Sequence, residues 1–449
     1  MPTAISDLSA YHLLIEQFAK ARRETDDLFA IVRPEALYDR PIAERHRIVF
    51  YIGHLEAFDW NLFRDRVPGL ESFNPDFDRL FAFGIDPVGG GLPTDQASEW
   101  PPISAVRKYV QEVRSILDEK LEKALDADLS QGEIGSGHFP LDTLLNVATE
   151  HRLMHAETLA YMFHQLPFDR KINQVEALDL EKSPVEHRSI EIPAGPLVLG
   201  LNREGGIFGW DNEFESHTVE VPAFSIDKCK VTNRQYLQFI EAGSYQTPTH
   251  WSPEDWNWIS KNKISHPAFW KRDNPNNNWL FRTMFEDVPL PPDWPVYVSQ
   301  AEAKAYAKWA GKSLPTEAEW QRAAYCEPNG EQRPYPWGSE TPSPEFGNFN
   351  FERWSPAPVN AFAAGESAYG VQGMLGNGWE WTASEFVPFP GFEAFPFYPG
   401  YSANFFDGKH FVMKGGSART AACMLRPTFR NWFQAHYQFI YTGFRCVSR

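Results

Sequence analysis

His151-Arg-Leu-Met-His155-Ala-Glu157 places two histidines four residues apart within a segment of strongly helical character. Residues 141–165 contain neither Pro nor Gly, and their apolar side chains recur at the spacing of one helix face. Side chains four positions apart on a helix lie on one face, about 6 Å apart, so both imidazoles can reach one metal ion. Histidines in such an apolar pattern point into a bundle core, where facing helices build metal sites.

A helix with two histidines needs a third ligand from another part of the fold. Phe50-Tyr-Ile-Gly-His54-Leu-Glu56 supplies a candidate, His54, in a second helical segment. Imidazole suits Fe, Zn, Cu and Ni, so the pattern predicts a three-histidine site with open positions for other ligands. The alternative is that the histidines are ordinary core residues, because an isolated His-x3-His pair is usually accidental.

Length, charge and cysteine content restrict the class of protein. A chain of 449 residues is too long for one ordinary core, so two domains are expected. The net charge of −17 argues against nucleic acid or an anionic membrane as a partner. There is no apolar run of about eighteen residues, which a membrane span needs, and residues 1–7 do not resemble a signal peptide. Four cysteines without a Cys-x-x-Cys spacing favour a reducing, cytoplasmic location.

Residues 1–170 predict an antiparallel four-helix bundle. Its helices are expected at 6–30, 42–65, 103–127 and 141–165, with Ser6 or Asp7 capping the first. The loop at 68–102 is long and rich in Pro, Gly and Asp. Loops longer than about fifteen residues are often functional, and we expect this one to fold over the metal end of the bundle.

The composition changes after a charged linker predicted at 171–189. In residues 190–449, Gly, Pro, Trp and short β-like runs dominate. Strands are expected at 190–192, 197–199 and 218–221, and helices at 232–242 and 299–310. The predicted fold class is α+β, with a helical bundle followed by a domain that has little regular secondary structure.

Seven phrases of the second half carry a family resemblance. They are Val231-Thr-Asn-Arg-Gln-Tyr236, Pro295-Val-Tyr-Val-Ser299, Leu314-Pro-Thr-Glu-Ala-Glu-Trp320, Tyr335-Pro-Trp-Gly338, Gly376-Asn-Gly-Trp-Glu-Trp-Thr382, Gly415-Gly-Ser417 and Gly443-Phe-Arg445. In this order they resemble the formylglycine-generating-enzyme (sulfatase-modifying factor) fold, a variant of the C-type lectin fold. Those enzymes use a pair of reactive cysteines near the C-terminus. Here Cys423 lacks such a partner, so we expect a different activity and a small buried side chain at this position.

The helical bundle with its His-x3-His-x-Glu motif, placed before this domain, resembles the DinB-like half of the ergothioneine-biosynthesis sulfoxide synthases. Members of that family are non-heme iron enzymes that use O2 to join sulfur to C2 of the imidazole of hercynine (Nα-trimethylhistidine). The resemblance implies Fe(II) as the cofactor and His54, His151 and His155 as its ligands. It also implies that Glu157 orients a ligand histidine.

The resemblance extends to substrate-binding residues. Asn431 and Trp432 match the family's pair that holds the betaine end of hercynine, and an aromatic face suits a quaternary ammonium group, which has no N–H to donate. Phe50, one turn before His54, is expected to extend this cage. Two tyrosines three positions apart match a family segment, which implies Tyr398 as the catalytic proton donor and Tyr401 at the substrate. The alternative for both is packing in an aromatic-rich loop.

The site for the chalcogen donor departs from the family. Members that use γ-glutamylcysteine carry an acid directly after Asn-Trp and an arginine four positions further, where this chain has Phe433 and Tyr437. The arginines typical of the loop before the third helix are missing from residues 92–101, and Met154 replaces a glutamine. A donor with two carboxylates needs charged partners, whereas aromatic faces suit a sugar ring. We therefore expect Phe433 and Tyr437 to contact a selenosugar in selenoneine synthesis. Ergothioneine-type coupling of cysteine or γ-glutamylcysteine is the alternative.

Two further interpretations stay open, and a third is disfavoured. A DinB-type thiol transferase that uses the histidines with a divalent metal predicts O2-independent activity. A non-catalytic binding module predicts no bound metal. Ovothiol-type enzymes usually carry an extra methyltransferase domain, for which this chain is too short. The sequence predicts neither an oligomeric state nor a structural cation in the second domain.

Overall fold

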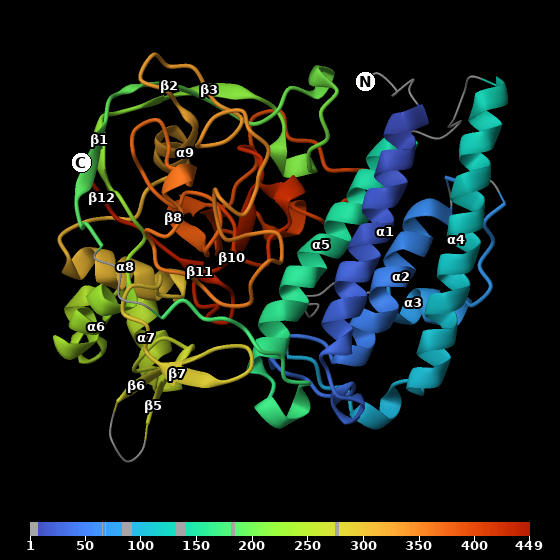
Figure 1. Cartoon of the computed structure of the whole chain (residues 1–449), viewed down its shortest axis with the longest axis horizontal. Coiled ribbons are helices and arrows are strands. Elements are labelled where there is room, and N and C mark those ends of the chain that lie inside the picture. Colours follow the sequence, from blue (N-terminus) through green and yellow to red (C-terminus); the bar gives the residue numbers. More distant parts are fainter. Residues whose placement is uncertain are drawn as a thin grey trace. The chain divides into compact units, whose positions relative to one another are not determined.

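The computed structural model describes residues 8–64, 66–67, 69–82, 92–131, 140–180, 185–273 and 278–449. The chain divides into two compact units, residues 1–173 and 174–449 (Figure 1). The boundaries expected from the sequence, at 170 and 190, stay a prediction.

The first unit is helical. Its helices are α1 (Leu8–Ala30), α2 (Ile48–Arg64), α3 (Pro75–Leu80), α4 (Ile103–Gln131) and α5 (Leu141–Gln165). α1 packs against α5, and α2 packs against both α4 and α5. The helix predicted at 141–165 is confirmed at both ends, because the flanking residues Pro140 and Leu166 have extended backbones.

α2 begins six residues later than the predicted range 42–65, at Ile48. The backbone before it turns back on itself, so that the N–H of Ile48 donates to the carbonyl of Asp39 at 3.1 Å. The side chain of Arg47 is held by Asp95, with 3.0 Å between Nε and Oδ2. Contacts with distant residues therefore override the local helical pattern.

Other helix ends differ less. α4 extends four residues beyond the predicted 103–127, since no Pro or Gly interrupts it before Gly132. The predicted caps Ser6 and Asp7, the predicted helix end Asp65 and the loop start Pro68 lie outside the described residues.

The described residues of the long loop at 68–102 include α3 and a 3-10 turn, Ala97–Glu99, neither of which was predicted. Asn74 caps α3 by accepting the N–H of Phe77 at 3.2 Å, and Pro75 occupies the first helical position. Asn followed by Pro is a common helix start, so this signal was present in the sequence and was missed.

The described residues of the second unit form four small sheets. Their strands are β1 (Ser189–Ile192), β2 (Gly195–Leu199), β3 (His217–Val221), β4 (Phe224–Asp227), β5 (Trp270–Arg272), β6 (Trp279–Arg282), β7 (Asp287–Pro289), β8 (Trp379–Glu385), β9 (His410–Lys414), β10 (Asn431–Gln434), β11 (Thr442–Gly443) and β12 (Val447–Ser448). The strand orders are β1-β4-β12, β10-β9-β8-β11, β2-β3 and β5-β6-β7. The strands predicted at 190–192, 197–199 and 218–221 lie within β1, β2 and β3 and are confirmed.

The helices of this unit begin with side-chain caps. They are α6 (Asn233–Glu241), α7 (Pro253–Asn262), α8 (Gln300–Trp309) and α9 (Glu317–Tyr325). Thr232 and Ser299 form capping boxes with the residues three positions on, so the helices predicted at 232–242 and 299–310 are confirmed. Thr316 caps α9 in the same way, inside one of the motif phrases.

Residues of the predicted linker pack on the second unit. Glu176 accepts the backbone N–H groups of Trp354 and Ser355, each at 2.9 Å. The carbonyl of Asp179 accepts the indole N–H of Trp294 at 2.7 Å.

All four cysteines are free. Cys423 is exposed, which contradicts the expectation of a buried side chain, because it lies in a 3-10 turn, Ala422–Met424, on the surface of its unit. Within the described ranges, no helix is long and apolar enough to cross a membrane.

Candidate active site

Three imidazoles converge in the core of the helical unit. His151 and His155 lie one turn apart on α5, and His54 lies on α2. The Nε2 atom of His155 is 3.2 Å from Nε2 of His54 and 3.2 Å from Nε2 of His151. All three side chains are buried, and their possible ligand atoms lie within 4.8 Å of one another. The structure thus brings the three predicted ligands together.

The electrostatics of this cluster suit a metal. Burial lowers the pKa of His54 to about 4. Burial also lowers the pKa values of His151 and His155 well below the usual value, and repulsion from the neighbouring imidazoles adds to this. All three rings are therefore neutral at pH 7, which is the form that binds metals. Metal–imidazole bonds of about 2.1 Å at angles of roughly 90–100° put two ligand nitrogens about 3.0–3.2 Å apart. The observed spacing fits one ion.

A backbone carbonyl fixes the orientation of His54. Its Nδ1 atom lies 2.7 Å from the carbonyl oxygen of Phe81, just after α3. A carbonyl only accepts, so Nδ1 carries the proton and Nε2 keeps its lone pair for a metal. Gly53 makes room for this segment, because a Cβ at this position would lie 2.6 Å from the Phe81 ring. The described part of the long loop therefore contacts the histidine cluster through Phe81, and folding of the whole loop over the metal end stays a prediction.

Aromatic rings enclose the cluster. Phe58 stacks on His151 with 3.4 Å between ring centroids, and Phe50 stacks on His54 at 4.9 Å. Phe50 also contacts His46 at 4.2 Å and is 1% exposed. These rings hold the imidazoles in place and keep bulk water away. The predicted role of Phe50 at the substrate stays a prediction.

A buried ion network lies beneath the histidines. Arg152, next to His151 on α5, donates to Glu56 at 3.0 Å and pairs with Asp59, both on α2. Burial alone would raise the pKa of Glu56, but Arg152 and Arg114 lower it to about 2. Burial raises the pKa of Asp59 to about 6, although Arg152 opposes this. The network connects the two helices that carry the histidines. No pattern in the sequence predicted it.

Glu157 is buried on α5, two residues after His155. Its predicted role of orienting a ligand histidine stays a prediction.

The second unit brings three predicted residues into one aromatic cluster. Trp432 on β10 stacks on Phe386 at 4.1 Å and meets the edge of Tyr401 at 5.3 Å. Tyr398 lies 5.5 Å from Tyr401. Phe405, 5.6 Å from Trp432, completes this side. Phe405 follows the segment with the two tyrosines that carries the family resemblance, whereas only a high aromatic content pointed to Phe386.

Phe433 and Tyr437 form a separate pair. Successive residues of a strand face opposite sides, so Asn431 and Phe433 lie on one face of β10 and Trp432 on the other. Phe433 stacks on Tyr437 with 5.1 Å between ring centroids. The Asn431 side chain accepts the backbone N–H of Trp432 at 2.9 Å. Two aromatic rings thus occupy the positions at which the family resemblance implied charged side chains.

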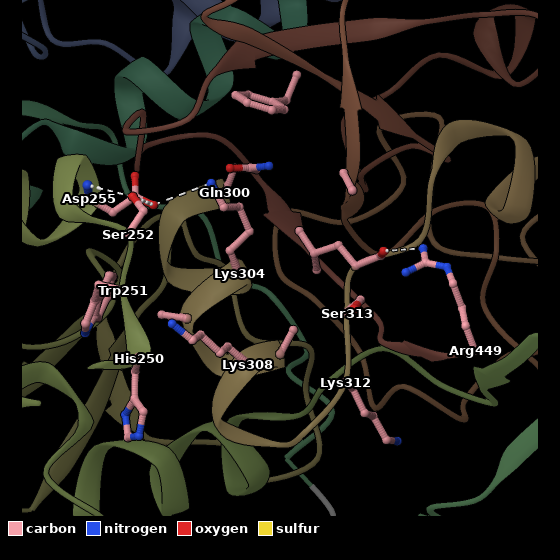
Figure 2. A pocket seen from close by; sticks show the side chains of 15 residues that line it. His250, Trp251, Ser252, Asp255, Gln300, Lys304, Lys308, Lys312, Ser313 and Arg449 are labelled. Atoms are coloured by element: carbon pink, nitrogen blue, oxygen red, sulfur yellow. Dashed lines mark hydrogen bonds and ion pairs between the residues drawn. The ribbon is translucent and has the colours of Figure 1, made fainter. Parts of the chain in front are cut away.

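A surface cavity of about 510 Å³ lies elsewhere in this unit, along α8 (Figure 2). Among the residues that the structure describes, those lining the cavity include none of the predicted site residues. They do include the cations Lys304, Lys308, Lys312 and Arg449. Three of these are already paired, Lys304 with Asp255, Lys312 with Asp227 and Arg449 with Glu319. Because these pairs stabilise the fold, the cavity is a weaker site candidate than the two clusters above.

Comparisons with known proteins agree with this division. Residues 176–449 match the sulfatase-modifying factor enzyme 1-like domain, and residues 17–159 match the DinB superfamily. The predicted fold class is confirmed by these two matches together with the structure.

The chain is similar to three named proteins along most of its length. It is 36% identical to the hercynine oxygenase of Mycolicibacterium smegmatis over 84% of this chain and 86% of that protein. It is also 36% identical to the hercynine oxygenase of Mycobacterium tuberculosis, over 76% of each. The ergothioneine biosynthesis protein 1 of Neurospora crassa is 30% identical over 92% of this chain and 55% of that protein.

Proposed function

Because the chain belongs to the hercynine oxygenase family, we propose that it is a non-heme Fe(II)- and O2-dependent enzyme that joins a chalcogen donor to C2 of the hercynine imidazole. The convergence of His54, His151 and His155 carries this proposal, since it provides a buried, neutral three-nitrogen site in a chain similar to hercynine oxygenases. Three protein ligands leave positions open for substrates and O2.

The residues around the histidines support such chemistry. His54, His151 and His155 would hold Fe(II), which when bound supplies the redox chemistry that O2 activation needs. The carbonyl of Phe81 keeps the His54 ring in its metal-binding tautomer. Phe58 and Phe50 exclude water from the cluster, which protects reactive species from side reactions.

In the second unit, the indole of Trp432 would bind the trimethylammonium group of hercynine through the ring face opposite Phe386. Asn431, on the other face of β10, is kept as a second expected contact of hercynine. Tyr398 would donate the proton that the coupling requires, and Tyr401 would contact the substrate. The ring contacts of Tyr401 with Tyr398 and Trp432 support their action as one group.

A sulfur donor, cysteine or γ-glutamylcysteine, is the donor that the relatives favour. Both hercynine oxygenases and the ergothioneine biosynthesis protein are named for the sulfur pathway or its substrate, and none for selenium. The selenosugar expected from the sequence is kept as a second candidate. The stacked Phe433–Tyr437 pair supports it, because aromatic faces suit a sugar ring better than a dicarboxylate.

The free cysteines support action in a reducing cytosol. The substrates are small molecules, with neither nucleic acid nor membrane as a proposed partner.

The test is anaerobic loading with Fe(II), followed by O2 and hercynine with cysteine, γ-glutamylcysteine or a selenosugar in parallel reactions read by mass spectrometry. We expect the main product to be a sulfoxide whose sulfur comes from the thiol and is bonded to C2 of hercynine. A dominant selenium adduct would establish the second candidate. No adduct with any donor, or a product formed without O2, would refute the proposal.

A further inference from the structure

The loop that carries Tyr398 and Tyr401 is built from two linked turns. The N–H of Tyr398 donates to the carbonyl of Phe395 at 3.0 Å, and the N–H of Tyr401 donates to that of Tyr398 at 3.1 Å. These hydrogen bonds join the two tyrosines into one short segment, whose position depends on its contacts with the rest of the unit.

Asp211 contacts both ends of this loop. It begins a 3-10 turn, Asp211–Glu213, and is fully buried. The hydroxyl of Ser402, directly after Tyr401, donates to its carboxylate. The backbone N–H of Phe395 stabilises the same carboxylate. Asn212 adds a hydrogen bond from its amide nitrogen to the Ser402 hydroxyl at 2.9 Å.

The neighbours of Asp211 contact the rest of the aromatic cluster. Trp210, which is fully buried, stacks on Tyr401 with 4.0 Å between ring centroids. The carbonyl of Asn212 accepts from the guanidinium of Arg430 at 3.3 Å. Arg430 is itself held by two hydrogen bonds to Glu317 and directly precedes Asn431 and Trp432. One segment, 210–212, thus contacts both the tyrosine loop and Arg430, the residue directly before the strand with the expected hercynine residues.

We infer that Asp211 is a positioning residue that sets the Tyr398–Tyr401 loop against Trp432 for the coupling reaction, an inference that rests on the proposed function. A buried carboxylate is costly to the fold, and burial raises the pKa of Asp211 to about 6 although Ser402 and the backbone oppose this. Buried carboxyl groups with a shifted pKa cluster at functional sites. A displacement of about 1 Å at a reacting group can cost about a hundredfold in rate, so its anchor matters for catalysis.

The test compares Asp211→Ala, Asp211→Asn and Ser402→Ala with the wild-type, iron-loaded protein. Asn keeps an acceptor oxygen for the Ser402 hydroxyl but loses the negative charge that strengthens this bond, so it should retain an intermediate rate. Ser402→Ala removes the hydrogen bond to Asp211 while it leaves the Asp211 side chain in place and creates no large cavity, and it serves if Asp211→Ala fails to fold. Asp293→Asn is the control, because Asp293 is also buried and pairs with Arg234 instead.

Two readouts are measured, namely hydrogen exchange of residues 395–402 and steady-state kinetics with hercynine. We expect faster exchange in this loop, a kcat lowered by about tenfold or more, a much smaller change in KM and unchanged iron content in Asp211→Ala. Unchanged exchange, or an unchanged kcat despite faster exchange, overturns the inference. A wild-type protein that forms no adduct refutes the proposed function instead, and the exchange comparison then still decides whether Asp211 anchors the loop.

Discussion

The Nε2 atoms of His54 and His155 lie 3.2 Å apart, although 101 positions separate the two residues in the sequence. Both rings are buried and neutral, and Nδ1 of His54 carries its proton. A lone pair of His54 therefore faces its neighbour in a desolvated core, an arrangement that a bound cation stabilises.

Removing one ligand should abolish metal binding. We expect His151→Ala to lose bound iron and coupling activity together, because two imidazoles rarely retain a metal that three hold. Iron content after anaerobic loading and desalting measures this. His250→Ala, in the second unit, is the control and should keep its iron. Full iron occupancy in His151→Ala would show that the ligand assignment is wrong.

The glycine before His54 offers a steric test. A Cβ at position 53 would lie 2.6 Å from the Phe81 ring, so Gly53→Ala must displace the segment that orients His54. We expect a loss of about 1–3 kcal/mol in unfolding free energy and weaker iron binding. Gly205→Ala is the matched control, because no atom lies within 4 Å of its added Cβ. Equal stabilities of the two variants in denaturant titrations would refute the tight packing of Phe81 on α2.

Much of this arrangement follows from local pattern. The apolar periodicity around His151 predicted both ends of α5 correctly. Thr232 and Ser299 cap α6 and α8 at the predicted positions. The predicted start of α2 was wrong because the carbonyl of Asp39 accepts the N–H of Ile48, and Asp95, 48 positions from Arg47, holds the Arg47 side chain. Such long-range contacts leave no periodic signal.

The same limit applies to the candidate site. The histidines could be named from spacing and family resemblance, whereas Phe81 and Asp211 act through contacts that only the folded chain creates. Phe81 contributes a backbone carbonyl, which no residue type encodes.

The aromatic cluster should govern hercynine affinity. We expect Trp432→Ala to raise the KM for hercynine by about 5–30-fold, equivalent to about 1–2 kcal/mol of cation–π attraction, with Trp432→Phe recovering part of it. Tyr398→Phe should instead lower kcat and leave the KM nearly unchanged, because it removes a proton donor and keeps the ring. Initial-rate kinetics separate the two effects. A wild-type kcat in Tyr398→Phe would show that a group other than Tyr398 donates the proton.

Charge at the Phe433–Tyr437 pair should change the choice of donor. The double variant Phe433→Asp with Tyr437→Arg restores the acid and arginine typical of enzymes that use γ-glutamylcysteine. We expect kcat/KM for γ-glutamylcysteine to rise by about tenfold or more relative to cysteine, since hydrogen bonds between charged groups contribute about 1.5–3 kcal/mol. Competition assays with both thiols measure this ratio. An unchanged ratio of kcat/KM for the two thiols would show that the donor does not bind at Phe433 and Tyr437.

The second unit contains a buried ion pair with a defined pH dependence. Glu380 accepts from Arg445 at 2.6 and 2.8 Å and lies 3.1 Å from Lys230. Burial alone would raise the Glu380 pKa, but Arg445 and Lys230 lower it below its ordinary value of 4.5. Its stabilising contribution is therefore complete above pH 4.5 and is lost as the pH falls through the lowered pKa. We expect Glu380→Gln to cost about 3–5 kcal/mol at pH 7 and less in acid, as measured by urea unfolding across pH. A penalty that does not change with pH would contradict this.

The most direct test of the central claim is an electron paramagnetic resonance spectrum of the Fe(II)-loaded protein with nitric oxide, recorded before and after hercynine is added. Nitric oxide binds non-heme Fe(II) at an open position, and the resulting signal senses what binds beside it. We predict an iron–nitrosyl signal that changes when hercynine binds and is absent from His151→Ala. A signal that hercynine leaves unchanged, or one that persists in His151→Ala, would contradict a three-histidine iron centre at which hercynine reacts.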